Sequence, residues 1–431
     1  MLSINRCLIL LTTGFPYGAD EPFLESELPY LAEHFKRIFI FAVDALPGSP
    51  PTRAVPSHAQ CFGLARHGKK ASRVLDLAGA VIKPPMNNGA YLEERKKRAA
   101  GFQKRLFLAY FEKRSARLAA ECRSILEGLG LDGFDDVVIY SYWLFVTARA
   151  GSLLAEALKP RLGTLRFYSR AHGYDIYDFR NRLGYLPMRE HLLGAADAVF
   201  PCSGHGSRYL CGKYPAYSEK IRTSYLGTPD FGSGPVKEED VFHIVSCSRL
   251  VPLKRVDRIL SSLELLKNSG LKLRWTHIGG GKSLPALKKQ AASSLGFMEC
   301  CFNGAVPNRE VYRFYAETPV SLFVNVSSGE GLPVSIMEAA SFGIPAVATD
   351  VGGTSEIVAD ALTGRLLKPD FSDADLAAAI ADFAAMPAAA YAQMRERTRE
   401  AWQAKFNSSL NYASFSRMIA GEGVENIRSG V

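Results

Sequence analysis

The sequence of 431 residues lacks any apolar run that approaches the ~20 residues of a membrane-spanning helix, which argues against a segment that crosses a bilayer. It has eight cysteines, but none forms a Cys-x-x-Cys pair and most lie in apolar stretches. This usage argues against a zinc site and predicts free thiols in a reducing compartment, so we expect a cytoplasmic protein. The apolar run at 7–11 is short and has no small-residue cleavage site, so it is interpreted as a first β-strand rather than a signal peptide.

The length is too great for one ordinary core and predicts two or three domains. A strand, a glycine-containing turn and a helix open the chain, as in a doubly wound nucleotide fold. Strand–helix alternation starts again after a Pro- and Gly-rich stretch. We therefore predict an α/β fold with two Rossmann-like, doubly wound domains that face each other across a cleft. The expected division is an N-terminal domain at 1–225, a linker at 226–240, a C-terminal domain at 241–400 and a helical tail at 401–431 that packs back on the N-terminal domain.

The strands can be placed from short apolar runs. They are predicted at 4–11, 37–43, 136–141, 165–170, 198–202, 242–248, 273–279, 320–324 and 346–349. Residues 44–65 are rich in Pro and Gly and are predicted to be a loop, and residues 91–126 have the apolar periodicity of a helix.

Positive charge is concentrated in residues 66–123, which contain fifteen basic and five acidic residues, a net charge of +10. The whole chain carries +9, so this segment accounts for all of the excess. Two interpretations remain open: a core-packed helix with a solvated charged face, or a surface that rests on anionic lipid headgroups at the inner face of the cell membrane. Nucleic-acid binding is not expected, because no recognition motif or interleaved aromatic residues accompany the bases.

Two carboxylates, Glu330 and Glu338, stand eight residues apart around the sequence Gly-Leu-Pro. A helix that starts at about Pro333 would carry the second, roughly 8 Å along its axis from that proline. The amino terminus of such a helix suits an anionic group. One carboxylate could therefore meet each end of a ligand with phosphate in its middle, which is the shape of a nucleotide-sugar.

Basic and polar residues follow predicted strands elsewhere. Arg249 and Lys254 come directly after 242–248 and suit a diphosphate. The glycine run that begins at Gly279 does not fit a Walker motif, because Thr276 stands where its first glycine is needed, so only a tight turn is expected there. His172 and Asp175 follow 165–170, where they could hydrogen-bond a sugar hydroxyl.

These motifs resemble glycosyltransferase family 4, whose members are retaining enzymes of the GT-B fold. The resemblance is dense from about 242 to 370 and is carried by the stretches 248–255, 303–307, 330–338, 343–353 and 363–366. In the first half it depends on Gly14, Glu21-Pro-Phe and residues 170–175, and there it is similar to enzymes that build bacterial surface polysaccharides.

The resemblance implies roles for individual positions. Arg249 and Lys254 would hold the donor diphosphate as it leaves, and Glu330 would contact donor-sugar hydroxyls. His172 would touch the donor sugar near the reacting carbon, and Glu338 would bind the ribose. Three further positions would line the donor: the Gly331 and Leu332 amides near the sugar, and the backbone at Val306 at the base. Gly14 would lie in a phosphate loop, although Phe15-Pro16 follows it where many members have a second glycine.

We therefore expect a glycosyltransferase that uses a nucleotide-diphosphate sugar, with UDP favoured over GDP, and a glycan or lipid-linked acceptor. No metal or other cofactor is implied, and Glu330 and Glu338 are interpreted as two hydroxyl clamps rather than an acid/base pair. Two alternatives remain: a sugar-nucleotide epimerase of the same fold, and a non-catalytic subunit that binds a nucleotide-sugar and regulates a partner.

Overall fold

The computed structural model describes residues 5–18, 20–65, 69–82, 85, 88–236 and 241–422, with only the backbone of 69–72. The chain divides into two compact units, which are described separately. Unit 1 consists of residues 1–226 together with 410–431, and unit 2 consists of residues 227–409. The boundary between the units after residue 226 falls at the start of the linker predicted at 226–240, and the domain end predicted at 400 falls within unit 2.

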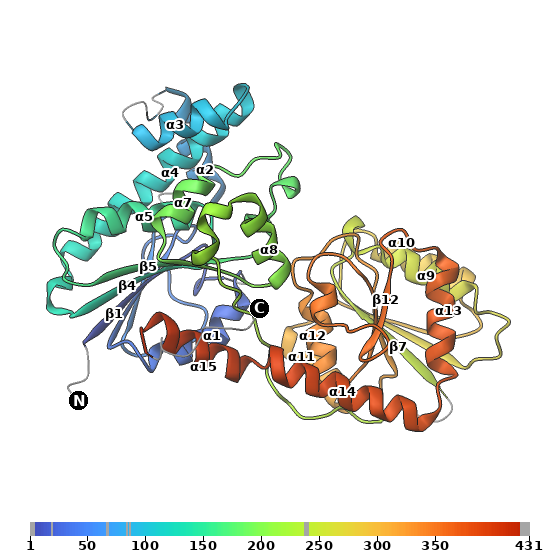
Figure 1. Cartoon of the computed structure of the whole chain (residues 1–431). Coiled ribbons are helices and arrows are strands. Elements are labelled where there is room, and N and C mark those ends of the chain that lie inside the picture. Colours follow the sequence, from blue (N-terminus) through green and yellow to red (C-terminus); the bar gives the residue numbers. More distant parts are fainter. Residues whose placement is uncertain are drawn as a thin grey trace. The chain divides into compact units, whose positions relative to one another are not determined.

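Unit 1 contains a six-stranded parallel sheet (Figure 1). Its strands are β1 (Arg6–Thr12), β2 (Arg37–Ala42), β3 (Ala59–Gly63), β4 (Asp136–Ser141), β5 (Leu165–Ala171) and β6 (Ala198–Pro201), in the order β3-β2-β1-β4-β5-β6. β1 and β4 are almost entirely buried, and near-continuous apolar runs of this kind are typical of strands covered on both faces.

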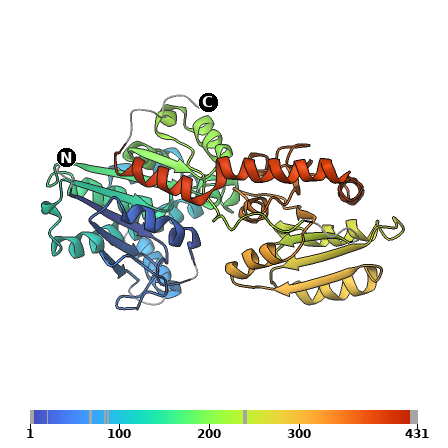
Figure 2. The ribbon, with the colours of Figure 1, turned by 90° about the horizontal axis from the view of Figure 1, so that it is seen from below.

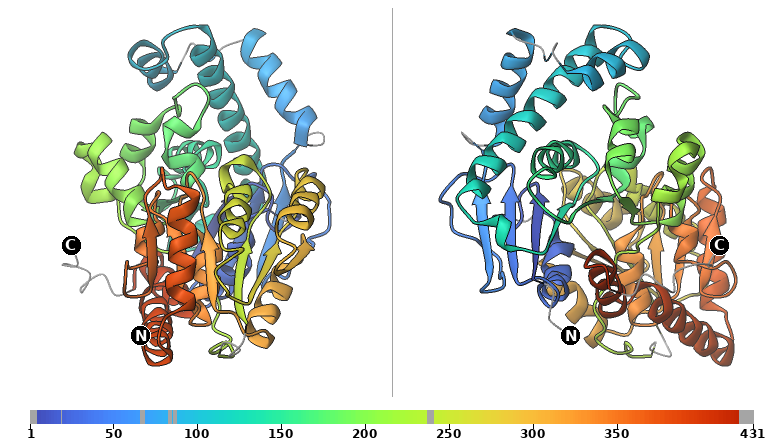
Figure 3. Two further views of the ribbon diagram at one scale, coloured as in Figure 1. Left: turned by 90° about the vertical axis from the view of Figure 1, so that its right-hand side faces the viewer. Right: turned by 60° about the vertical axis from the view of Figure 1, so that its left-hand side comes forward.

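Helices cover both faces of this sheet (Figure 3). They are α1 (Pro22–Ala32), α2 (Lys69–Ile82), α3 (Gly89–Lys97), α4 (Phe102–Glu127), α5 (Val146–Leu158), α6 (Gly173–Ile176), α7 (Arg189–Ala195), α8 (Gly204–Lys213) and α15 (Ser408–Ile419). α15 reaches unit 1 from the far end of the sequence and lies beside α1 (Figures 1 and 2), where Tyr412 contacts Tyr30 with ring centroids 6.3 Å apart.

A fully buried ion pair lies beneath α15. Arg170 Nη2 is 2.9 Å from Glu27 Oε2, and neither side chain is exposed to solvent. Tyr140 joins them, because its hydroxyl accepts from Arg170 Nε at 2.9 Å and donates to Glu27 Oε1 at 2.8 Å. The ring of Phe415 on α15 lies 4.1 Å from the guanidinium of Arg170. The last helix therefore completes the core of the first unit.

Unit 2 repeats the arrangement. Its strands are β7 (Phe242–Cys247), β8 (Leu273–Ile278), β9 (Glu299–Gly304), β10 (Leu322–Asn325), β11 (Ala346–Thr349) and β12 (Gly364–Leu367), in the order β12-β11-β10-β7-β8-β9. Its helices are α9 (Val256–Glu264), α10 (Leu284–Ser294), α11 (Asn308–Glu317), α12 (Val334–Ser341), α13 (Asp373–Ala384) and α14 (Ala388–Phe406).

Both sheets thus have the Rossmann strand order, in which the direction of winding reverses once. The reversal lies between β1 and β4 in unit 1 and between β7 and β10 in unit 2. Ligands of open parallel sheets bind outside the carboxyl ends of the strands at such a point. The prediction of two doubly wound α/β domains is confirmed.

Several predicted elements are wrong in detail. Residues 44–65 contain β3, an edge strand that is too short and too exposed to show a clear apolar pattern. The helix predicted at 91–126 is two helices, α3 and α4, because Gly101 between them adopts φ +82°, a conformation that ends helical continuity. β9 and β12 were not predicted at all.

Candidate active site

The switch point of unit 2 brings together a lysine and a carboxylate. Lys254 Nζ lies 2.5 Å from Glu330 Oε1, and Glu330 is only 9% exposed. Asn325, the last residue of β10, donates from Nδ2 to the same oxygen at 3.4 Å. The loops after β7 and β10 therefore meet, as the strand order requires, and the predicted neighbourhood of these two residues is present.

The loop after β7 is fixed by its own backbone and by Arg255. This residue adopts φ +46°, and its guanidinium donates to the carbonyls of Val326 and Ser327 at 2.7 and 3.1 Å. Lys254 is thereby held beside the loop after β10. Arg249, on the same loop, is exposed and forms no ion pair or hydrogen bond through its side chain with the described residues, so its charge is available to a ligand.

The glycine turn after β8 supports the loop after β7 instead of forming a phosphate cradle. Gly279 adopts φ +144°, and a Cβ there would lie 1.8 Å from the carbonyl oxygen of Ser248. A Cβ on Gly281 would lie 2.5 Å from the carbonyl oxygen of Leu250. The turn also donates from the Gly279 amide to the Gly304 carbonyl at 2.8 Å. It therefore packs between the loops after β7 and β9.

The loop that carries Glu330 has two amides without an internal partner. No described group accepts a hydrogen bond from the amide of Gly331 or Leu332, although Gly331 accepts from the amide of Gly353 at 2.8 Å. Gly352 has φ +60°, and a Cβ on it would lie 2.0 Å from the Glu330 carbonyl oxygen. The close approach of this glycine pair therefore fixes the backbone of Glu330.

Glu338 lies on α12, which begins at Val334 with Pro333 as its N-cap, one residue later than predicted. Its Oε1 accepts from Asn308 Nδ2 at 2.7 Å and from the Tyr312 hydroxyl at 3.4 Å, both on α11. The side chain is deeply buried, and burial raises the pKa of Glu338 to about 7 against the opposing effect of these two hydrogen bonds. A buried carboxyl with oxygen lone pairs left over suits hydroxyl groups of a ligand.

Two further observations connect this part of unit 2. The Cys247 thiol, at the end of β7, has its pKa raised to about 12 by burial and feels the charges of both Glu338 and Lys254. Val306 is half-buried in the loop between β9 and α11. That loop adjoins the glycine turn, since a Cβ on Gly280 would lie 3.2 Å from Ala305 Cβ. The unit 2 residues predicted from the motifs therefore share one edge of its sheet.

In unit 1, His172 follows β5 and is enclosed by aromatic rings. Its ring centroid lies 4.8 Å from that of Tyr142 and 4.5 Å from that of Trp143. Neither ring nitrogen has a hydrogen-bond partner among the described residues, and both are shielded from solvent. Burial, with Arg170 nearby, lowers the pKa of His172 to about 3, so the imidazole is neutral at physiological pH. Asp175 accepts from the His172 amide at 2.5 Å and holds the loop.

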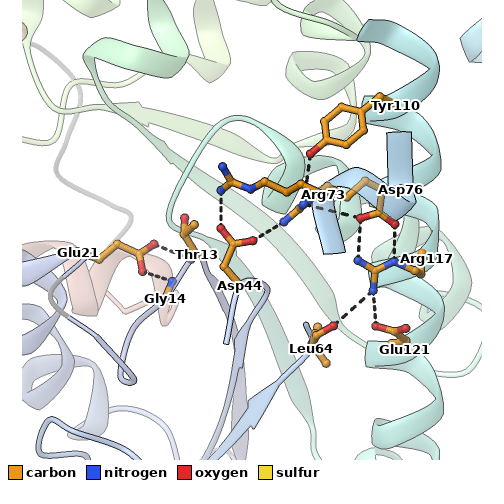
Figure 4. A network of polar contacts seen from close by, with 11 residues as sticks. Thr13, Gly14, Glu21, Asp44, Leu64, Arg73, Asp76, Tyr110, Arg117 and Glu121 are labelled. Carbon is orange, nitrogen blue, oxygen red and sulfur yellow. Dashed lines mark hydrogen bonds and ion pairs between the residues drawn. The ribbon is translucent and has the colours of Figure 1, made fainter. Parts of the chain in front are cut away.

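The glycine loop of unit 1 is already occupied by a carboxylate (Figure 4). Glu21 accepts from the amides of Thr13 at 2.7 Å, Gly14 at 2.9 Å and Phe15 at 2.8 Å, and from Trp143 Nε1 at 2.6 Å. Four donors satisfy both of its oxygens. The amide of Gly14 therefore has a partner within the chain, and the predicted role of Gly14 at a donor phosphate stays a prediction.

Some residues of the site were not predicted. Asn308, Tyr312 and Asn325 support the two carboxylates, and only proximity in the fold reveals them. Glu21 was noted as part of a motif, but its function as the anion of the glycine loop depends on a left-handed backbone at φ +59°. Among the described residues, no group of three or more His, Cys, Asp or Glu side chains could hold a metal ion, and no helix is long and apolar enough to span a membrane.

Comparison with known proteins agrees with this architecture. Residues 232–401 match the family model described as "Glycosyl transferases group 1". WcaL of Escherichia coli K12, named for colanic acid biosynthesis, is 28% identical over 249 residues, which are 56% of this chain and 60% of WcaL. A mannosyltransferase of Mycolicibacterium smegmatis, named as GDP-mannose-dependent, is 33% identical over 151 residues, which are 33% of this chain and 39% of the relative. The matches thus span less than two thirds of either relative.

A solved structure extends the likeness to both units. That of WaaB, a lipopolysaccharide outer core galactosyltransferase, covers 96% of this chain and 99% of its own, with a TM-score of 0.65 at 13% identity. At this identity the likeness shows the fold alone. The chain therefore has the GT-B fold, and its residues 232–401 match the family of group 1 glycosyl transferases. The predicted resemblance to enzymes of bacterial surface-polysaccharide synthesis is confirmed.

Proposed function

We propose that the chain is a retaining glycosyltransferase that moves a sugar from a nucleotide-diphosphate sugar to a glycan or lipid-linked acceptor in cell-surface polysaccharide synthesis. The observation that carries this proposal is the constellation at the switch point of unit 2. It consists of the Lys254–Glu330 ion pair, Arg249, which has no partner among the described residues, and the buried Glu338 on the neighbouring helix.

The charges of this constellation fit a diphosphate that departs. Transfer of a glycosyl group builds negative charge on the leaving diphosphate, and preorganised cations stabilise that charge most effectively. Arg249 supplies a planar fork, and the Gly331 and Leu332 amides supply donors, none of which has a partner in the part of the chain that the structure describes. In unit 1 the comparable loop amides already bind Glu21. We therefore assign the donor to unit 2, with Val306 at the base and Glu338 at the ribose.

The carboxylates are poorly placed to act as a strong general base. Glu330 is paired with Lys254, and Glu338 is buried against Asn308 and Tyr312. The imidazole of His172 is neutral, and among the described residues its two buried ring nitrogens have no hydrogen-bond partner, so they keep the capacity to bind a sugar hydroxyl. Front-face attack, with a donor phosphate oxygen taking the acceptor proton, asks for none of these groups to act as a base. This arrangement supports the proposal of retention.

The test uses the full chain with UDP-, GDP- and ADP-sugars, first for thermal stabilisation and then for turnover with an extract of lipid-linked glycans. A UDP-sugar is the donor that we predict, and the GDP-mannose-dependent relative makes a GDP-sugar the principal competitor. Nucleotide release that depends on added acceptor would distinguish a transferase from an epimerase. A chain that binds a donor but never turns it over with any acceptor would favour a regulatory subunit.

The site assignment has its own test. We expect Glu330→Ala and Lys254→Ala each to lower turnover by at least about tenfold, because each removes a charged group at the reacting end of the donor. Arg365→Ala is a matched control, since Arg365 forms an ion pair at the surface of the same unit, with Asp382 at 2.6 Å. Circular dichroism would verify that each variant is folded. Near-normal turnover in either site variant would refute the assignment.

A further inference from the structure

Helix α2 has an inverted distribution of side chains. Val74, Leu75, Val81 and Ile82 are 63%, 53%, 61% and 82% exposed. Together with Ala78, they recur at the spacings that place residues on one face of a helix. A helix at the surface of a soluble domain ordinarily presents polar residues on that face. Here the exposed face of α2 is apolar.

The opposite face of α2 carries the polar contacts (Figure 4). Asp76 accepts from Arg117 Nε at 2.8 Å and from Arg117 Nη2 at 3.0 Å, which ties α2 to α4. Arg73 Nη2 lies 2.6 Å from Asp44 Oδ2, in the loop after β2. Ala80 is the only buried apolar residue among the described side chains of α2. Ion pairs and a small residue therefore hold this helix in place, and its large apolar residues remain 40% to 82% exposed.

Basic residues without ion-pair partners lie at the same end of unit 1. Lys96 on α3 and Lys104 and Arg105 on α4 form no ion pair with any described residue. Phe102, at the start of α4, is 79% exposed among them. α2 and α3 both pack against α4, on different sides of it (Figure 3). Arg105 Nε donates to the Ala99 carbonyl at 3.3 Å and Lys104 Nζ lies 5.7 Å from the centroid of the Tyr185 ring, so both bases keep a charge that no carboxylate of the described residues neutralises.

Other basic residues of the segment 66–123 form ion pairs with carboxylates of the same chain. Those with carboxylate partners are Arg73, Lys97, Arg98, Arg114, Arg117 and Arg123. Arg66 and Lys83, which were counted in the predicted basic segment, lie outside the described residues, as do the side chains of Lys69 and Lys70. The charge of 66–123 is therefore only partly available to a partner, and electrostatic attraction alone does not describe this surface.

We propose that the apolar face of α2, with the adjoining bases of α3 and α4, docks onto an anionic lipid surface. The apolar side chains enter the boundary between headgroups and acyl chains, and the bases contact the anionic headgroups. Charge complementarity favours this occupant over a second copy of the chain, because two copies would bring like charges together. The proposal deepens the proposed function, since a lipid-linked acceptor would be presented at the same surface. Lipid binding is measured without donor or turnover, so either proposal can fail alone.

The test measures binding of the full chain to vesicles of phosphatidylcholine mixed with phosphatidylglycerol. We expect the Val81→Ser/Ile82→Ser variant to bind at least about tenfold more weakly, because affinity scales with the apolar area that enters the bilayer. The matched control is Leu265→Ser/Leu362→Ser, which alters two leucines of unit 2 that are 58% and 53% exposed. This control should bind as the wild type does.

Salt separates the two contributions. Wild-type binding should weaken as salt rises, but a residual affinity should persist at high salt because apolar burial is not screened. Lys96→Glu/Lys104→Glu should remove the salt-dependent part and leave the residual part. Unchanged vesicle affinity of the Val81→Ser/Ile82→Ser variant would overturn the proposal. A wild-type dimer in analytical ultracentrifugation that the Val81→Ser/Ile82→Ser variant dissociates would also overturn the proposal, because a second copy of the chain would then cover the apolar face of α2.

Discussion

The environment of Glu338 makes a quantitative prediction about stability and pH. Burial raises the pKa of this carboxyl from an ordinary value of 4.5 to about 7. The folded protein therefore holds a proton on Glu338 that the unfolded chain releases above pH 4.5. This proton stabilises the fold fully below pH 4.5, and the stabilisation is lost as the pH rises through 7. Each pKa unit corresponds to about 1.4 kcal/mol, so the loss between pH 4.5 and pH 8 is about 3 kcal/mol.

The perturbation that isolates this effect is Glu338→Gln, which preserves the shape of the side chain and cannot ionise. Urea denaturation of both proteins at several values of pH gives the free energy of unfolding of each. The difference between variant and wild type cancels all other titrating groups. Relative to the wild type, the variant should gain about 3 kcal/mol between pH 4.5 and pH 8.

The control is Glu299→Gln, on β9 of the same unit. Arg274 Nε lies 2.7 Å from Glu299 Oε2, and this hydrogen bond lowers the pKa of Glu299. A lowered pKa contributes stability above the ordinary value that is lost as the pH falls, so its variant should show a pH dependence of opposite sign. If Glu338→Gln showed no relative gain towards pH 8, the argument that burial raises the pKa of Glu338 would be refuted.

Three further predictions concern single residues. Gly352→Ala should lower turnover at least about tenfold, because a Cβ at this position displaces Glu330. The control is Gly270→Ala, which has φ +73° and no atom near the position of a Cβ, and it should leave turnover unchanged. Equal effects of the two variants would show that backbone strain alone is responsible. Glu27→Gln should lower the free energy of unfolding by about 3 kcal/mol or more in urea, because it leaves its buried arginine partner without a counter-charge, and a loss below about 1 kcal/mol would contradict this account. His172→Asn should change the rate but not the shape of the pH–rate profile above pH 5, because the pKa of about 3 keeps the imidazole of His172 neutral there. An inflection near pH 6 in the wild type that is missing in the variant would contradict this prediction.

The fold could be predicted where its strands are buried on both faces. β4 and β11 coincide with their predicted bounds, and other central strands differ by a residue or two, because an uninterrupted apolar run is a strong signal. Three of the four edge strands, β3, β9 and β12, could not be found in this way, whereas the fully buried edge strand β6 could. Their exposed faces accept polar residues, and pairing with a neighbour that is distant in sequence decides their conformation.

The site shows the same division between local and tertiary information. Lys254 and Glu330 could be associated because both follow strands that a parallel sheet aligns at one edge. The partners of Glu338 could not, because Asn308 and Tyr312 lie on a helix whose polar positions are indistinguishable from a solvated face. The exposure of the apolar face of α2 also could not be predicted from the sequence, because helical periodicity identifies an apolar stripe but not whether that stripe faces the core or the solvent.

The position of α15 has a consequence for the order of events during translation. This helix covers a face of the unit 1 sheet, where Phe415 and Ile419 pack in one buried cluster with Leu8, Leu10 and Tyr140. The ribosome makes these strand residues first and α15 only after all of unit 2. Until then the nascent sheet exposes an apolar face and the buried Arg170–Glu27 pair lacks its aromatic cover. The core of the first unit is therefore completed only when the end of the chain emerges, and part of its apolar surface stays exposed to aggregation until then.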